Sequence, residues 1–146
     1  MKAKAFLEVV DDDRILAAIR DAEGRSRGEV RVHVAGGQVK DARAAAESVF
    51  PRLGMTGTVE RNGVLIFVAP ESQTFAVVGD EAIDRCVEEG YWSSIVEAMA
   101  GRFRSGQFTD GIVEAVRTVG KELARHFPRR PGEDDVNELP DAISQG

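Results

Sequence analysis

Cysteine and histidine are scarce in this sequence, which contains one of the first and two of the second. The single cysteine, Cys86, excludes an internal disulfide and a zinc site built from several thiolates. We expect Cys86 to be a buried, inert thiol, because it falls on the apolar face of a predicted helix. His33 and His126 are far apart in the sequence. We interpret His33 as a half-exposed strand residue and His126 as a cation at the end of the last helix.

Long apolar runs are also missing. No stretch approaches the roughly 18 to 20 apolar residues that a membrane-spanning helix needs. The first residues are basic at Lys2 and Lys4 but soon run into Asp11, Asp12 and Asp13, without the apolar core of a signal peptide. We therefore expect no membrane insertion and a cytoplasmic location.

Positive charge is outweighed by negative charge, with 19 Lys and Arg residues against 25 Asp and Glu residues and a net charge of −6. Binding to a nucleic acid or to an anionic membrane needs a basic face, so we expect neither as a main partner. An acidic excess suits cation binding, although it is also ordinary for a soluble protein.

The chain of 146 residues is long enough to fold as one domain with a sizeable core. We place that domain at residues 1–128. The composition changes after it, and residues 129–146 are predicted to form a tail. The tail is either exposed or docked on the domain through Leu139 and Ile143.

Motifs that would identify an enzyme are lacking. The sequence has no G-x-S-x-G nucleophile elbow, no H-E-x-x-H zinc motif and no G-K-[ST] phosphate loop. Ser72 and Ser105 have no evident base. If the protein transfers a phosphoryl group, the residues favour a metal-assisted route, in which a cation polarises the phosphate and the attacking water.

The most informative stretch lies in the middle of the chain. Two apolar runs, residues 64–69 and 74–79, flank a short polar connector that contains proline, which predicts a β-hairpin. The first run is apolar without alternation, as expected of a strand buried on both faces. Antiparallel pairing brings the outer ends of the runs together, and so places Asn62 near Asp80 and Glu81.

A strand and a helix precede this hairpin. Residues 29–34 alternate strictly between polar and apolar, and apolar residues recur at helical spacing through residues 42–53. The path strand, helix, strand predicts a right-handed βαβ unit with parallel strands. Glu29, at the start of its strand, then lies at the same end of the sheet as Asn62 and Asp80.

The acidic residues at this end of the sheet have two interpretations. Asp80 is a good N-cap for a helix that starts at Glu81, and capping stabilises the fold without any ligand. Alternatively, Asp80 caps the helix and also binds a cation together with its neighbours. The same choice arises at Asp11, Asp12 and Asp13, where capping of the first predicted helix is the simpler interpretation.

A basic and aromatic patch precedes the last predicted helix. Arg102 and Arg104 flank Phe103, and Phe108 follows closely. The patch either holds a phosphate or forms a solvated rim over two buried rings. We favour the rim, because the sequence has no glycine-rich phosphate loop.

The central stretch also resembles a known family. Asn62-Gly63 with the apolar run 64–69, followed by Val78-Gly79-Asp80-Glu81, is similar to the core of the TPM domain. That family includes thylakoid-lumen acid-phosphatase-like proteins and many bacterial proteins. The resemblance covers most of residues 9–127 and continues through Trp92, Phe103-Arg104-Ser105-Gly106-Gln107-Phe108 and Asp110-Gly111-Ile112.

The end of the chain is similar to one branch of this family. His126-Phe127-Pro128 and Asn137-Glu138-Leu139-Pro140-Asp141 resemble the soluble bacterial members without a membrane anchor. Pattern and resemblance together predict an α/β fold, a three-layer α/β/α sandwich with a small mixed β-sheet.

The resemblance and the acidic cluster predict divalent-cation binding, with calcium preferred and magnesium as a second choice, because all candidate ligands are oxygen atoms. Asn62, Asp80 and Glu81 match the family motif, whereas Glu29 and Asp84 are added from geometry alone. Two functions stay open. One is a regulatory or protein-binding module that responds to the cation and has an unidentified protein partner. The alternative, implied by the resemblance, is a metal-assisted acid phosphatase that acts on small phosphate esters.

Overall fold

A mixed β-sheet lies at the centre of the fold. The computed structural model describes residues 1–129 and 143–146. Its four-stranded sheet has the order β3-β2-β1-β4, with β1 parallel to β2 and β4, and β2 antiparallel to β3. The strands are β1 (Glu29–Val34), β2 (Gly63–Ala69), β3 (Thr74–Gly79) and β4 (Ile143–Gln145). The predicted hairpin and the predicted parallel pair are both confirmed.

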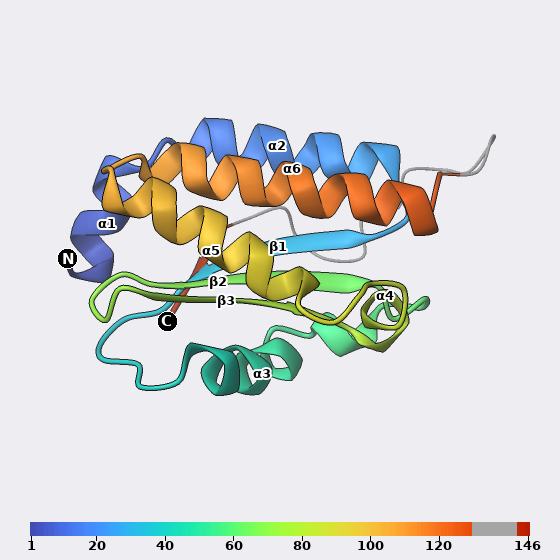
Figure 1. Ribbon diagram of the computed structural model, residues 1–146, viewed down its shortest axis with the longest axis horizontal. Helices are drawn as coiled ribbons and strands as arrows, with labels where there is room; N and C mark the ends of the chain where they lie inside the picture. Colours follow the sequence, from blue (N-terminus) through green and yellow to red (C-terminus); the bar gives the residue numbers. More distant parts are fainter. Residues whose placement is uncertain (130–142) are drawn as a thin grey trace.

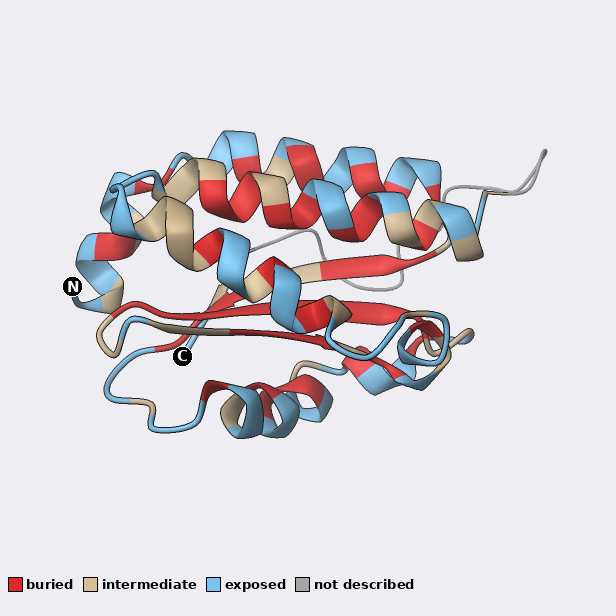
Figure 2. Cartoon of the chain, viewed as in Figure 1, coloured by how far each residue is buried: buried red, intermediate tan, exposed pale blue. Residues whose placement is uncertain are grey.

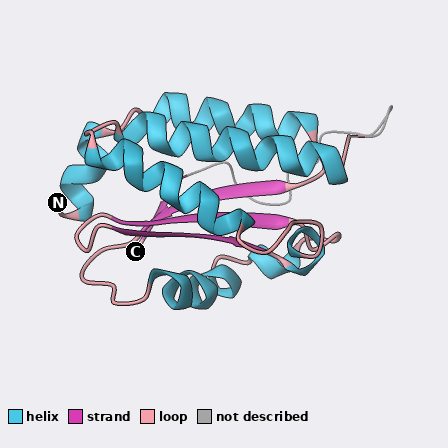
Figure 3. Cartoon of the chain, viewed as in Figure 1, coloured by secondary structure: helices cyan, strands magenta, loops and turns pink. Residues whose placement is uncertain are grey.

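Helices cover both faces of this sheet (Figure 1). One face carries α2 (Asp12–Arg25), α5 (Tyr91–Arg104) and α6 (Phe108–His126), with the short α1 (Ala3–Val9) at one end of this layer. The other face carries α3 (Ala42–Arg52), and two short helices, η1 (Met55–Gly57) and α4 (Glu81–Asp84), lie in connections. The three-layer α/β/α sandwich is therefore confirmed (Figure 3). In the described part of the chain, no helix combines the length and the apolar character that crossing a membrane needs.

The two faces of the sheet have separate apolar cores. Alternation along the strands sends Val32 and Ile66 into the core under α2, α5 and α6. It sends Leu65 and Phe67 into the core under α3. Every residue of β2 is buried, in agreement with its uninterrupted apolar sequence (Figure 2). The hairpin is thus anchored on both faces, which fixes the positions of the loops at its two ends.

Aspartates begin two of the longer helices. Asp11 accepts a 3.1 Å hydrogen bond from the backbone N–H of Arg14, and Asp41 accepts one of the same length from Ala44. Each cap of this kind stabilises a helix by about 1 kcal/mol. The capping interpretation of Asp11 is confirmed.

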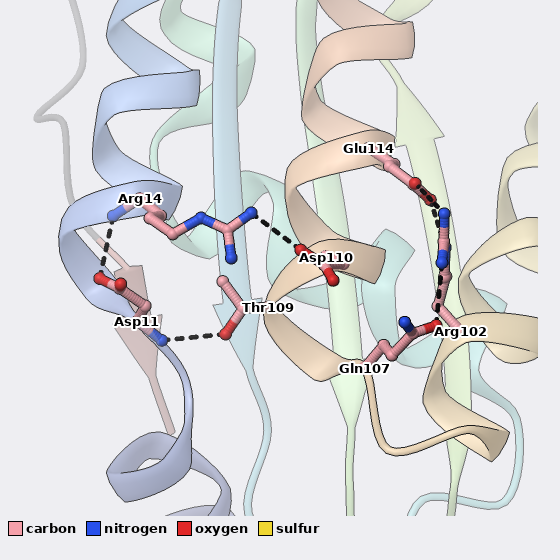
Figure 4. A network of polar contacts seen from close by, with 7 residues as sticks. All are labelled: Asp11, Arg14, Arg102, Gln107, Thr109, Asp110 and Glu114. Atoms are coloured by element: carbon pink, nitrogen blue, oxygen red, sulfur yellow. Dashed lines mark hydrogen bonds and ion pairs between the residues drawn. The ribbon is translucent and has the colours of Figure 1, made fainter.

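A polar network joins the starts of α2 and α6 (Figure 4). Arg14 donates a 2.8 Å hydrogen bond to the Asp110 carboxylate, and the Asp11 amide donates a 3.0 Å bond to Thr109 Oγ1. The hydrogen bond from Arg14 lowers the pKa of Asp110. The network fixes the two helices against each other at the end of the molecule where α1 lies.

Arg102 belongs to the same framework (Figure 4). Its guanidinium donates hydrogen bonds of 3.0 and 2.6 Å to the Glu114 carboxylate and one of 2.9 Å to Gln107. The hydrogen bonding to Glu114 raises the pKa of Arg102. Phe103 and Phe108 nearby are only partly buried, so the predicted rim is present but its rings are less covered than expected.

Two expectations about single residues are wrong. His33 is only 5% exposed, because β4 pairs with β1 and places Ser144 Oγ 2.9 Å from its Nδ1, while its ring stacks on Phe67. Cys86 is exposed rather than buried. The helix that would have carried Cys86 inward, α4, ends at Asp84, so the predicted helical spacing does not continue that far.

The end of the predicted tail forms β4, one of the two edge strands of the sheet. Ile143 lies opposite Val32 of β1 and packs against the core of the main helical layer. Leu139 and the family-like segment 137–141 lie outside the described residues, so nothing further is said of them.

Candidate cation site

The candidate residues lie at the edge of the sheet that is formed by the ends of three strands, where β1 and β2 begin and β3 ends. Glu29 at the start of β1 lies opposite Gly63 at the start of β2. On the other side, the Asp80 amide donates a 2.8 Å hydrogen bond to the Gly63 carbonyl. Gly63 is therefore the midpoint of this edge, with Glu29 and Asp80 on its two sides.

Asp80 fixes the turn from β3 into α4. Its side chain is almost fully buried, and Oδ1 accepts a 2.8 Å hydrogen bond from the Glu81 amide. Asp80 is thus the N-cap of α4, as both interpretations of the sequence predict. Glu81 follows in the first turn of the helix with its side chain half exposed.

Arg61 is the residue at this edge that sequence reasoning misses. Its guanidinium donates two hydrogen bonds to Asp80, from Nε to Oδ2 at 2.7 Å and from Nη2 to Oδ1 at 2.8 Å. Its Nη1 lies 3.6 Å from Glu81 Oε1. A two-bonded arginine–carboxylate pair is among the stronger polar contacts in proteins, and its bonding to Asp80 raises the pKa of Arg61.

The hairpin register predicts that Arg61 lies at this edge. The register that places Asn62 near Asp80 also places Arg61 near the residues that follow Asp80. The Ala82 amide accordingly donates a 3.0 Å hydrogen bond to the Arg61 carbonyl. The backbone of Arg61 has φ of 52°, a left-handed conformation that is uncommon for a residue with a side chain and that a sequence pattern does not reveal.

Asn62 and Glu29 are buried at the same edge, 1% and 5% exposed. The Asn62 side-chain amide donates a 3.2 Å hydrogen bond to the Arg27 carbonyl. Arg27 in turn forms hydrogen bonds of 2.9 and 3.0 Å with the Glu60 carboxylate. Asn62 therefore ties the loop before β1 to the start of β2.

Asp84 contacts a different residue. Its Oδ1 accepts a 2.8 Å hydrogen bond from the indole Nε1–H of Trp92, which is 6% exposed. A buried indole N–H needs such an acceptor. Asp84 thus anchors the core tryptophan with its side chain, whereas its link to Asp80 is a 2.9 Å hydrogen bond from its backbone amide to the Asp80 carbonyl.

The resulting site has two carboxylates, those of Asp80 and Glu81, that face one positive group. Within residues 1–129 and 143–146, no group of three or more His, Cys, Asp or Glu side chains is placed to hold a metal ion. Any cation at this edge would have two anionic ligands and would take the rest from water and from neutral oxygen atoms. Such a low ligand charge corresponds to weak binding.

The comparisons with known proteins concern the chain as a whole. Residues 2–122 match the family model described as the TPM domain. The search of curated proteins gives no match. Among solved structures, the chain is similar to the NMR structure of the BA42 protein from the psychrophilic bacterium Bizionia argentinensis. The two share 38% identity with a TM-score of 0.83, over 94% of this chain and 96% of that chain.

A second solved structure is the N-terminal domain of a protein from P. gingivalis. It has 20% identity and a TM-score of 0.57, over 80% of this chain and 75% of that chain. At this level of identity the likeness extends to the fold alone.

Proposed function

We propose that this chain, which belongs to the TPM domain family, is a binding module that responds to a divalent cation. The cation is held by the carboxylates of Asp80 and Glu81, with Asn62 and Glu29 as buried polar neighbours. Calcium is preferred over magnesium, because calcium accepts irregular shells of oxygen ligands whereas magnesium demands near-octahedral geometry.

One observation carries the proposal: a single guanidinium, that of Arg61, contacts both carboxylates. The two acidic side chains therefore converge on one positive charge in the fold. A divalent cation at this position would neutralise both of them, whereas the guanidinium carries only one charge. Calcium and Arg61 compete for the same oxygen atoms.

The competition gives the module a way to respond. The Arg61 side chain is 39% exposed, so it can move into water at a smaller cost than a buried arginine would have. Calcium binding then moves a positive group from the ion pair to the protein surface. The partner that binds in response to this change is a protein with an acidic contact surface, because such a surface gains an ion pair with Arg61 when calcium releases it.

Metal-assisted phosphatase activity on small phosphate esters is the alternative function. A cation held by Asp80 and Glu81 would supply the polarising charge that this route needs. The alternative is separated from the binding module by turnover of an activated phosphate ester with and without calcium. Turnover that depends on calcium and is lost on changing Asp80 to Asn favours the enzyme.

Calorimetric titration with calcium and with magnesium tests the proposal. We expect a calcium dissociation constant on the order of 10⁻⁴ to 10⁻³ M, as for sites with few anionic ligands. Asp80→Asn should abolish most of this heat. Asp41→Asn, which changes the capping residue of α3 in the same way, is the matched control and should bind like the parent. No heat at millimolar calcium, or equal heat in both variants, would contradict the proposal.

A further inference from the structure

The end of the molecule opposite Asp80 holds an aromatic cavity. The chain turns from α5 into α6 at Gly106, which has φ of 75° and so suits a residue without a side chain. The turn brings Phe103 and Phe108 together with their ring centres 5.2 Å apart. Phe75 of β3 lies 4.7 Å from Phe103, and Phe6 of α1 packs against both helical rings at 5.7 and 5.5 Å.

These rings line a cavity of about 540 Å³, which Pro70 and Gln73 of the hairpin turn border. The volume falls within the range of small-molecule sites, which are mainly apolar with a few polar groups. Phe6 is fully covered, whereas Phe75, Phe103 and Phe108 keep part of their surface exposed. An apolar ligand that covers these rings would therefore remove aromatic surface from water.

Arg104 supplies a charged side chain to this cavity. It lies in the last turn of α5, is exposed and lines the cavity beside the rings. Arg102, two residues earlier, is bound to Glu114, whereas in the described part of the chain no hydrogen bond or ion pair engages the Arg104 guanidinium. A guanidinium at the edge of an apolar cavity favours a ligand that carries a carboxylate.

We propose that this cavity binds small carboxylates with an aromatic or alkyl body, the body lying against Phe75, Phe103 and Phe108 and the carboxylate pairing with Arg104. This ligand site is separate from the cation site. The hairpin turn that borders it lies at the other end of β2 and β3 from Gly63 and Asp80 (Figure 1). Its test is therefore independent of calcium binding.

The experiment titrates the full chain with three probes while recording amide chemical shifts. 4-Phenylbutyrate has both the ring and the carboxylate, 4-phenylbutanol has only the ring, and acetate has only the carboxylate. We expect phenylbutyrate to shift the amides of residues 73–75 and 100–108, phenylbutanol to bind about tenfold more weakly, and acetate not to bind. Tenfold corresponds to one charge-assisted contact at a partly exposed site.

Arg104→Gln separates the two parts of the recognition. It should lower the affinity for phenylbutyrate to that for phenylbutanol and leave the affinity for phenylbutanol unchanged. Arg125→Gln, which changes an exposed arginine on α6 far from the cavity, should leave both probes unchanged. A second variant, Ala100→Leu, fills the cavity and should abolish binding of both probes while the amide spectrum stays that of a folded protein. Equal affinity for the alcohol and the acid, full phenylbutyrate affinity in Arg104→Gln, or shifts that fall elsewhere would each overturn the proposal.

Discussion

Arg61 and Asp80 form a two-bonded ion pair at the edge of the sheet, with hydrogen bonds of 2.7 and 2.8 Å. The two partners differ in how far their side chains are exposed to solvent. The Asp80 side chain is 6% exposed and also caps α4, whereas the Arg61 side chain is 39% exposed. Asp80 is therefore the fixed member of the pair, and Arg61 is the member that a competing cation can displace.

Asp80 has two roles that mutation separates. Asp80→Asn keeps an acceptor for the Glu81 amide, whereas Asp80→Ala loses the cap and should lower the free energy of unfolding by about 1 kcal/mol more. Both variants lose an anionic ligand. Calcium should raise the melting temperature of the parent by mass action and raise it less in either variant. If the parent and Asp80→Asn gain equally from calcium, Asp80 is only a cap.

We expect Asp84 to stabilise the core and not to bind the cation. Asp84→Ala leaves the buried indole N–H of Trp92 without its acceptor, which should cost about 1 to 3 kcal/mol of unfolding free energy in urea. Calcium affinity should not change. Glu88→Ala, in the exposed segment between α4 and α5, is the control and should alter neither the unfolding free energy nor the calcium affinity. A loss of calcium affinity in Asp84→Ala as large as that in Asp80→Asn would make Asp84 a ligand.

His33 should titrate below its usual range. Burial, and then the positive charges of Arg31 and Arg52, lower the pKa of His33 from its ordinary value of 6.5. The unfolded chain therefore binds a proton that the folded chain does not. The free energy of unfolding should fall as the pH drops below 6.5, down to the pKa of the folded state.

Two variants test this account of His33. His33→Asn should remove the change in stability within that pH window. Arg52→Gln should raise the pKa of His33, measured from its ring proton shifts, whereas Arg43→Gln at the other end of α3 should leave it unchanged. A pKa at or above 6.5 in the parent would show that burial does not control this group.

Much of the fold could be predicted from the sequence, because its main signals are local. The apolar run of β2, the proline-containing turn and the alternation of β1 define the hairpin and the βαβ unit. The β4 strand could not be predicted in this way, because it has three residues and its pairing with β1 joins segments far apart in the chain. The error on His33 has the same cause, since Ser144 comes from that strand.

The candidate site was predictable only in part. Strand register placed Glu29, Asn62 and Asp80 at one edge, and the structure has them there. What register does not supply is the direction in which each side chain turns. Asp84 bonds to Trp92, and Arg61 reaches Asp80 from a left-handed backbone conformation. Both contacts depend on packing between elements, which strand register alone does not determine.

Calcium titration of Arg61→Gln against the parent tests the central claim most directly. The claim is that Arg61 occupies the place of the cation, so removing its charge should remove a competitor. We predict that Arg61→Gln binds calcium severalfold more tightly than the parent, while Arg43→Gln, an exposed arginine paired with Glu47 on α3, binds as the parent does. If Arg61→Gln binds calcium no more tightly than the parent, the guanidinium does not stand in for a cation, and the edge at Asp80 is a structural ion pair.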